Sequence, residues 1–316
     1  MNLYITSDKC ILHDNGVYHP EMGERLKRIQ DYLISNQLYD WFLHADARAA
    51  TNEEITLFHH PELIAKLEKN TPENGSVEVS EDIHLSRESL NAARHAVGAV
   101  LDAVDAVVLG KAQRAFCNVR PPGHHAEYNE SKGFCLFNNV AIGAAYAMQK
   151  YGLQRVAIVD FDVHHGNGTE DFVRREPRAF LISSFEHPLY PYSEPESDIA
   201  NMVKMPLSKF AKSEDFQQAW LEKGLPALDK FAPELIIISA GFDAHALDPL
   251  GNLQLHESDF VWITQQIIQL ANKHCQGKII SVLEGGYDLG ALRVSATEHI
   301  KTLFELDFSA QELALV

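Results

Sequence analysis

The residues best suited to chemistry form the run Asp-Phe-Asp-Val-His-His-Gly-Asn-Gly at 160–168, directly after the apolar segment 156–159. A short, uninterrupted apolar segment is typical of a strand buried on both faces of a parallel sheet. Side chains two residues apart on a strand point the same way, so Asp160, Asp162 and His164 should share one side. A metal with ligand bonds of about 2 Å could bind Asp162 and His164, with Asp160 behind them orienting another residue. Such a site needs one more protein ligand, and a position left open for water would make it catalytic.

Aspartate and histidine at strand ends can also do no more than cap turns. The run at 160–168 combines carboxylates, adjacent imidazoles and two turn glycines, however, and this combination favours a metal site over turn capping. We therefore expect a metal-dependent centre at the end of this strand.

The elements that must position this run alternate between strands and helices. Apolar segments predict strands, and helical spacing with cap residues predicts helices, one of them capped by Ser258. This alternation predicts an α/β fold with a mostly parallel central sheet and helices on both faces. With 46% hydrophobic residues, the chain suits a single domain over residues 1–316. The expected strands are 115–119, 156–159, 179–183, 235–239 and 279–283, and the expected helices are 92–108, 138–148, 259–274 and 291–305.

Polar clusters follow four of these strands, at 120–125, 160–168, 240–244 and 284–288. In open α/β sheets ligands bind beyond the carboxyl ends of the strands, so the four clusters should converge. The convergence supplies Asp243 as the third metal ligand. It also brings two more histidines and a tyrosine to the metal, namely His124, His125 and Tyr287.

The overall composition excludes several classes of protein. A net charge of −17 argues against nucleic-acid binding, which needs a basic face. The first residues lack a basic segment followed by an apolar one, and the longest apolar runs are strand-sized, so we expect no secretion signal and no membrane span. Four cysteines without CxxC spacing are expected to be free thiols in a reducing cytoplasm. His59-His60, before Pro61, is interpreted as a helix start or surface feature rather than a ligand pair.

Six motifs occur in one order along the chain: RPPGHHA at 120–126, GFC at 133–135, DFDVHHGNGTE at 160–170, SAGFDA at 239–244, DPLG at 248–251 and EGGYD at 284–288. Together with HPExxxR at 19–25, they resemble the zinc-dependent histone deacetylase superfamily, with the closest likeness to its class II and bacterial deacetylase-like members. The resemblance covers nearly the whole chain.

This resemblance implies the arginase-deacetylase fold, with zinc on Asp162, His164 and Asp243. It also implies a potassium ion close to the zinc, beside Asp160. The identity of the metal stays open on chemical grounds, because two carboxylates and one imidazole also suit Fe(II) or Co(II).

The resemblance also assigns roles in proton transfer. His124 and His125 match the tandem imidazoles of the family, with Asp160 behind the first and Asn167 behind the second, and Tyr287 matches the catalytic tyrosine. Only the aspartate is charged, so His124 should be the more basic imidazole and His125 the neutral general base. The tyrosine hydroxyl can donate to an oxyanion.

The implied substrate site is an acyl-lysine tunnel. Its walls match Gly133, Phe134 and Tyr190, and Asp82 matches a residue on the rim. Leu250 should face the mouth, at the position where polyamine deacetylases of the family carry a glutamate. The stretch 192–201 departs from the family, because it lacks the glycine-rich loop usual after the aromatic wall.

The expected function is therefore that of a zinc-dependent amidohydrolase that removes acyl groups, such as acetyl, from lysine side chains or similar amines by metal-activated water. An acetylpolyamine or other small acetyl-amine deacetylase of the same fold is the alternative, and Leu250 favours an acyl-lysine or other mono-amine. A binuclear ureohydrolase needs further aspartates, and an inactive acyl-lysine binder would lack the tyrosine or a tandem histidine. The sequence carries no indication of oligomeric state.

Overall fold

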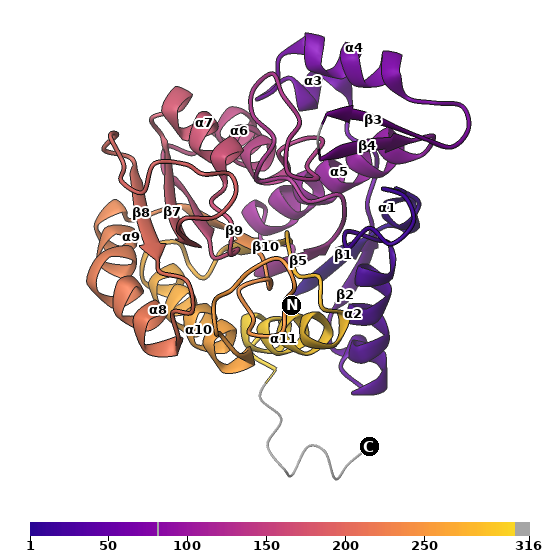
Figure 1. The fold of residues 1–316 in the computed structure, drawn as a ribbon. Helices are drawn as coiled ribbons and strands as arrows, with labels where there is room; N and C mark the ends of the chain where they lie inside the picture. The colour runs from indigo at the N-terminus through magenta and orange to yellow at the C-terminus, as the bar shows by residue number, and fades with distance from the viewer. Residues whose placement is uncertain (81, 307–316) are drawn as a thin grey trace.

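An eight-stranded sheet runs through the molecule, and all of its strand pairings are parallel. The computed structural model describes residues 1–80 and 82–306, so residues 307–316 of the expected domain lie outside the described residues. The strand order is β2-β1-β5-β10-β9-β6-β7-β8 (Figure 1). The strands are β1 Leu3–Thr6, β2 Leu43–Asp46, β5 Arg114–Asn118, β6 Val156–Asp160, β7 Ala179–Glu186, β8 Met202–Leu207, β9 Leu235–Ala240 and β10 Ile279–Leu283.

The centre of the sheet consists of the strands that the sequence predicts. Every residue of β5, β6, β7, β9 and β10 is buried, as a sheet covered on both faces requires. A separate antiparallel hairpin pairs β3 (Ser76–Ser80) with β4 (Ile83–Ser86). The predicted α/β class with helices on both faces of a parallel sheet is confirmed.

Helices cover both faces of the sheet (Figure 1). The helices α5 (Ser89–Val108), α6 (Asn139–Tyr151) and α7 (Asn167–Arg175) lie on one side, and α2 (Glu24–Ser35), α10 (Glu257–His274) and α11 (Leu289–Leu303) lie on the other. The other helices are α1 Asp8–Ile11, α3 Asn52–Ile55, α4 Pro61–Asn70, α8 Ser213–Ala219 and α9 Leu225–Phe231, with a 3-10 turn at Tyr39–Trp41 and a π-helical turn at Trp220–Gly224.

Some predicted helices differ from the structure at their ends: α5 begins at Ser89 rather than at 92, α11 spans Leu289–Leu303 rather than 291–305, and α10 begins early. The helix α10 begins at Glu257 with His256 as its N-cap, two residues before the expected cap Ser258. The reason is that the Asp259 carboxylate accepts hydrogen bonds from the His256 backbone N–H at 2.9 Å and from the Ser213 hydroxyl at 2.8 Å. The N-terminus of α10 is thus capped by an acidic side chain from the first turn of the helix itself.

Four neighbouring strands carry the polar clusters. In the order β5-β10-β9-β6 they lie side by side, and each ends where one cluster begins. Parallel strands end at the same edge of a sheet, so the clusters meet there. Within residues 1–80 and 82–306, no helix is both long and apolar enough to cross a bilayer.

Candidate active site

Two carboxylates and one imidazole converge beyond the ends of β6 and β9. Asp162, His164 and Asp243 each offer one ligand atom, and these atoms lie within 4.8 Å of one another. The His164 Nδ1 atom lies 3.0 Å from Asp162 Oδ1 and 3.2 Å from Asp243 Oδ2. The backbone orients both carboxylates, because the Val163 N–H donates to Asp243 Oδ1 and the Gly285 N–H donates to Asp162 Oδ2, each at 2.9 Å.

The electrostatics and packing of these groups fit a metal ion. Asp243 Oδ2 is buried without a hydrogen-bond donor in proper geometry, although His164 Nδ1 is close. Burial and the charge of Asp162 raise the pKa of the Asp243 carboxyl, so a cation bound between the two carboxylates would offset their repulsion. A Cβ atom on Gly285 would collide with both carboxylates. The chain therefore keeps glycine where the loop after β10 closes over the ligand set.

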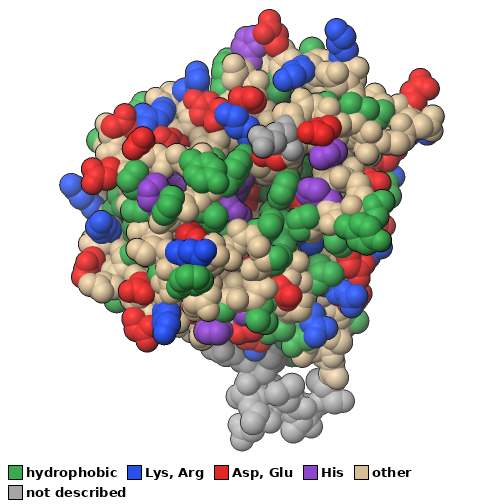
Figure 2. Space-filling view, in the orientation of Figure 1, with side chains coloured by type: hydrophobic (Ala, Val, Ile, Leu, Met, Phe, Trp, Pro, Cys, Tyr) green, Lys and Arg blue, Asp and Glu red, His purple; other side chains and the backbone are tan. Residues whose placement is uncertain are grey.

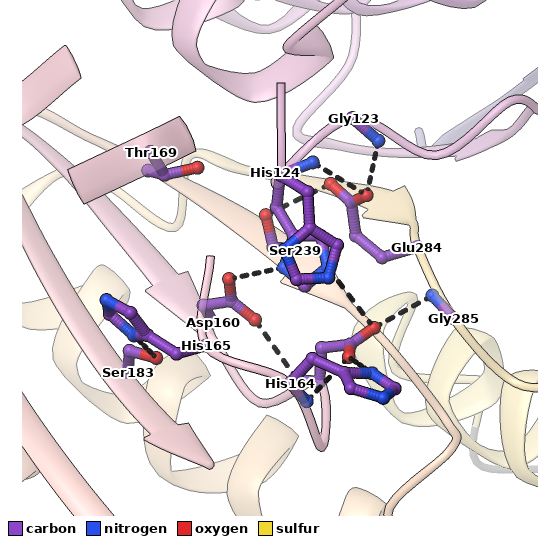
Figure 3. A network of polar contacts seen from close by, with 12 residues as sticks. Gly123, His124, Asp160, His164, His165, Thr169, Ser183, Ser239, Glu284 and Gly285 are labelled. Carbon is purple, nitrogen blue, oxygen red and sulfur yellow. Dashed lines mark hydrogen bonds and ion pairs between the residues drawn. The ribbon is translucent and has the colours of Figure 1, made fainter. Parts of the chain in front are cut away.

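His124 is held by negative charge. Its Nδ1 atom lies 2.9 Å from Asp160 Oδ2 and its Nε2 atom 3.8 Å from Asp162 Oδ2 (Figure 3). Burial by itself lowers the pKa of this imidazole, but the charges of Asp162, Asp160 and Glu284 outweigh it and raise the pKa well above its usual value. His124 is thus the charged imidazole of the pair.

His125 lies beside His124, but its pKa is shifted in the opposite direction. The two rings are 4.0 Å apart between centroids. The His125 Nδ1 atom bonds to Asn167 Oδ1 at 2.7 Å, which supplies a neutral partner. Burial lowers the pKa of His125 well below its usual value, and the charges on His124 and His164 lower it further.

A cavity of about 270 Å³ leads from the surface to His125 and His164. The predicted tunnel residues Gly133, Phe134, Tyr190 and Leu250 all line it. Figure 2 shows a hollow in this face of the molecule, with histidine and hydrophobic side chains gathered around it. The remaining lining residues are Asp82, Leu189, Tyr192 and Tyr287.

The tunnel walls are fixed by contacts around Asp82. Its Oδ2 atom accepts a hydrogen bond from the Tyr190 hydroxyl at 2.9 Å and one from the Gly133 N–H at 2.8 Å. The Tyr190 ring packs edge-on against His125, with centroids 5.0 Å apart. A Cβ atom on Gly133 would collide with the His125 ring, and the φ of +55° at this position is one that glycine adopts readily.

Tyr287 lines the cavity and is held from three sides. Its backbone N–H donates to Asp248 Oδ2 at 2.6 Å. The Arg25 guanidinium lies 4.9 Å from the centre of the tyrosine ring and donates from Nε to the Gly286 carbonyl at 2.7 Å. The ring also meets Phe134 edge-on, with centroids 6.0 Å apart. Burial raises the pKa of the hydroxyl well above its usual value, so it remains a proton donor.

The sequence interpretation missed one buried acid at the centre of this arrangement. The Glu284 carboxylate accepts from the backbone N–H groups of Gly123 (2.6 Å) and His124 (3.2 Å) and from the Ser239 hydroxyl (3.2 Å) (Figure 3). Burial raises the pKa of Glu284 to about 7. This residue ties the ends of β5, β9 and β10 together, and a charged residue directly after an apolar strand was the only signal for it.

A second group of possible metal ligands comprises His245, His256 and Glu257. Its geometry argues against a metal ion. The His245 Nδ1 atom accepts a hydrogen bond from the Leu247 N–H at 3.1 Å, so the proton of the neutral ring lies on Nε2. That atom lies 3.5 Å from the Glu257 carboxylate without a hydrogen bond in proper geometry, and a protonated Nε2 has no lone pair for a metal.

The His59-His60 pair takes two separate structural roles. His60 is the N-cap of α4, as the predicted helix start requires. His59 is buried rather than on the surface, and its Nδ1 atom bonds to the Glu127 carbonyl at 2.9 Å while Nε2 accepts from the Asn138 N–H at 2.8 Å. The surface alternative is therefore wrong for His59.

Comparison with known proteins gives the class of this chain. A family model described as the histone deacetylase domain matches residues 19–303. The chain therefore belongs to the histone deacetylase family, whose members are deacetylase and amidohydrolase enzymes.

Individual relatives cover the chain almost completely. It is 37% identical over 306 residues to the uncharacterized protein slr0245 of Synechocystis, covering 95% of this chain and 98% of that protein. It is 36% identical over 315 residues to polyamine deacetylase HDAC10 of Mus musculus, covering 93% of this chain and 46% of that protein. The chain spans only 14% and 31% of the length of the first two curated relatives that it matches.

A solved structure confirms the fold. The crystal structure of the HDA15 HD domain superposes with a TM-score of 0.90 at 31% sequence identity. The match covers 99% of this chain and 91% of that chain.

Proposed function

We propose that this protein is a zinc-dependent amidohydrolase that removes acyl groups from lysine side chains or similar amines. One observation carries the proposal: a cavity with aromatic and aliphatic walls is also lined by His164, one of three grouped metal-ligand side chains, together with His125 and Tyr287. An apolar passage with polar chemistry at its end suits a substrate whose extended stem carries a terminal amide.

The proposed metal ligands are Asp162, His164 and Asp243. A zinc ion held there would polarise the amide carbonyl and lower the pKa of a water molecule. The buried Asp243 Oδ2 without a donor and the neighbouring carboxylate of Asp162 support a cation at this position.

The two histidines divide the proton chemistry. The hydrogen bond from His125 Nδ1–H to Asn167 Oδ1 leaves the Nε2 lone pair of the neutral ring free to take a proton from water. The same ring can then return that proton to the leaving nitrogen. The Asp160 carboxylate behind His124 favours the protonated form of this imidazole, and a positive charge there would stabilise the negative charge that develops during hydrolysis.

Tyr287 would donate its hydroxyl proton in a hydrogen bond to the carbonyl oxygen as that oxygen becomes negative. The contacts with Arg25, Asp248 and Phe134 hold the ring before substrate binds, so little reorganisation is needed. A tyrosine that keeps its proton serves this role, whereas a phenolate would repel the oxyanion.

Deacetylation of polyamines is the second candidate, because two relatives, from Mus musculus and Homo sapiens, are named polyamine deacetylases. Leu250 lines the cavity and offers no charge to a second ammonium group. Its apolar side chain favours the neutral stem of an acyl-lysine or another mono-amine. The potassium ion beside Asp160 stays a prediction, and replacing potassium by sodium in the assay tests it.

A deacylation screen of the zinc-loaded protein tests the proposal. It should compare acetyl-lysine peptides, longer acyl-lysines, acetylpolyamines and small acetylated amines in direct competition. We expect turnover of an acyl-lysine or another mono-amine and a lower kcat/KM for acetylpolyamines. Preference for an acetylpolyamine would move the substrate to the second candidate, and a lack of turnover on every substrate would contradict the proposed function.

A substitution at Asp243 tests the assignment of the metal ligands separately. Asp243→Ala removes a charged ligand, so zinc content and hydrolysis should both fall sharply. Glu257→Ala is the matched control, because it removes a carboxylate from the other group of possible ligands. Full zinc content in the Asp243 variant, or loss of zinc in the Glu257 variant, would refute the assignment.

A further inference from the structure

Asn167 connects His125 to a carboxylate that the sequence interpretation did not single out. Its Oδ1 atom lies 2.7 Å from His125 Nδ1, and its Nδ2 atom donates to Glu127 Oε1 at 2.7 Å. A weaker contact joins Nδ2 to the His125 carbonyl at 3.3 Å. The Glu127 carboxylate receives a further hydrogen bond at 3.0 Å from Lys132 Nζ. The four side chains thus form a continuous series of hydrogen bonds, and Asn167, Glu127 and Lys132 line a groove next to the cavity.

The orientation of the Asn167 amide determines what His125 can do. With Oδ1 facing the ring, His125 must donate from Nδ1, and its Nε2 lone pair is free to accept a proton. With the amide turned by 180°, the Nδ2 group would donate to Nδ1. The ring would then carry its proton on Nε2 and could not act as a base there. An aspartate in place of Asn167 has no such ambiguity, because both of its oxygens accept.

We propose that Glu127 is the positioning residue that fixes the Asn167 amide, and through it the base-competent tautomer of His125. A carboxylate only accepts hydrogen bonds, so it binds Nδ2 and repels Oδ1, which makes the turned amide unfavourable. This inference rests on the proposed role of His125 as general base. Glu127 itself is neither one of the candidate metal ligands nor one of the residues that line the cavity.

Glu127 also has a purely structural interpretation, since Lys132 binds both Glu127 and Glu130. The two interpretations differ in what they predict for Glu127→Gln. The neutral glutamine side chain can accept from or donate to the Asn167 amide, so it keeps the volume and loses the preference for one orientation. Glu130→Gln is the matched control, because it removes a charge from Lys132 at 3.1 Å without a hydrogen bond to Asn167.

The test measures Glu127→Gln in two backgrounds, with the zinc-loaded protein. With Asn167 present, we expect kcat to fall by about three- to tenfold with KM nearly unchanged, because part of the population holds the wrong tautomer. In the Asn167→Asp background, Glu127 faces a like charge, so the same Glu127→Gln change should leave kcat unchanged or raise it. Glu130→Gln should change kcat by less than about twofold in either background. A similar fall in kcat from Glu127→Gln in both backgrounds would refute the positioning role.

A second readout does not depend on substrate. Nitrogen-15 NMR of the histidine-labelled, zinc-loaded protein distinguishes a protonated Nδ1 from a protonated Nε2 on His125. We expect the Nδ1–H form in the wild type and a mixture in Glu127→Gln. An unchanged tautomer in that variant would overturn the inference even if the activity falls. If the wild type hydrolyses no substrate, the NMR result still decides the role of Glu127, while the proposed function fails separately.

Discussion

At the scale of single residues, two adjacent imidazoles differ because of what lies behind them. His124 is backed by the charged Asp160 and His125 by the neutral Asn167, and their pKa values shift in opposite directions. Both rings are buried, so burial alone would lower both values. The pattern follows the rule that paired acid and base groups are separated by their environments.

The first prediction concerns the tyrosine hydroxyl. Tyr287→Phe keeps the ring against Arg25 and Phe134 but removes the donor to the oxyanion, so kcat should fall by about a hundredfold or more with a smaller change in KM. Steady-state kinetics on an acyl-lysine peptide measure this. Tyr146→Phe is the control, because its hydroxyl bonds to Asp105 far from the cavity. Near wild-type kcat for Tyr287→Phe would exclude this hydroxyl from the mechanism.

The site residues in the polar clusters after the strands were predictable from the sequence. The residues that hold them in place by hydrogen bonds were not. Asp162, His164 and Asp243 follow apolar strands, and the expectation that they meet is what the structure shows. Glu284 and Glu127 gain their importance from partners 45 and 40 positions away along the chain. No local pattern marks such pairs, because burial and a donor from another element create them.

At the scale of elements, the predictable strands were the five with continuous apolar runs at the centre of the sheet. The five apolar strands at the centre of the sheet were found from composition alone, whereas β1, β2 and β8 were not. The edge strand β8 contains Lys204 and Pro206, and the other edge strand β2 is largely exposed. Polar or exposed residues thus interrupt the apolar signal in both edge strands. The interior strand β1 is largely buried but is only four residues long.

The second prediction concerns the loop after β10. Gly285→Ala places a methyl group against the Asp162 and Asp243 carboxylates, so it should lower zinc content and abolish hydrolysis while the circular dichroism spectrum keeps its helical signal. Gly290→Ala is the matched control in the same segment, because its methyl group meets only Asp288 Oδ1 at 3.2 Å. Wild-type zinc affinity in Gly285→Ala would show that the loop can move away without cost to the site.

At the scale of the whole molecule, a buried ionic network joins the N-terminal segment to the site. The Glu21 carboxylate lies between Arg120 (2.6 Å) and Arg25 (3.3 Å), and all three side chains are inaccessible to solvent. Burial raises the pKa of Glu21, but the two guanidinium groups outweigh it and hold the pKa at about 2. Arg25 in turn reaches the Gly286 carbonyl, so residues distant in sequence fix the loop of Tyr287.

The last prediction concerns stability in acid and follows from two histidines buried in the neutral form. Burial lowers the pKa of His299 to about 3 and that of His59 to about 4, from 6.5 for the exposed side chain. The unfolded chain therefore binds these protons first as pH falls. The contribution of these two histidines to the free energy of unfolding is fully present above pH 6.5. It is lost progressively below that pH, by about 2 kcal/mol for each histidine at pH 5.

His299 gives the sharper variant, because its ring bonds only to the hydroxyls of Thr264 and Ser281. The free energy of unfolding, measured in urea from pH 5 to 8, should depend less on pH in His299→Gln than in the wild type, even if the variant is less stable throughout. His44→Gln replaces an exposed histidine and should keep the wild-type pH dependence. An unchanged slope in His299→Gln would mean that this ring is protonated in the folded protein. Its buried position, between the β10 strand and α10, would then have to accommodate a charge.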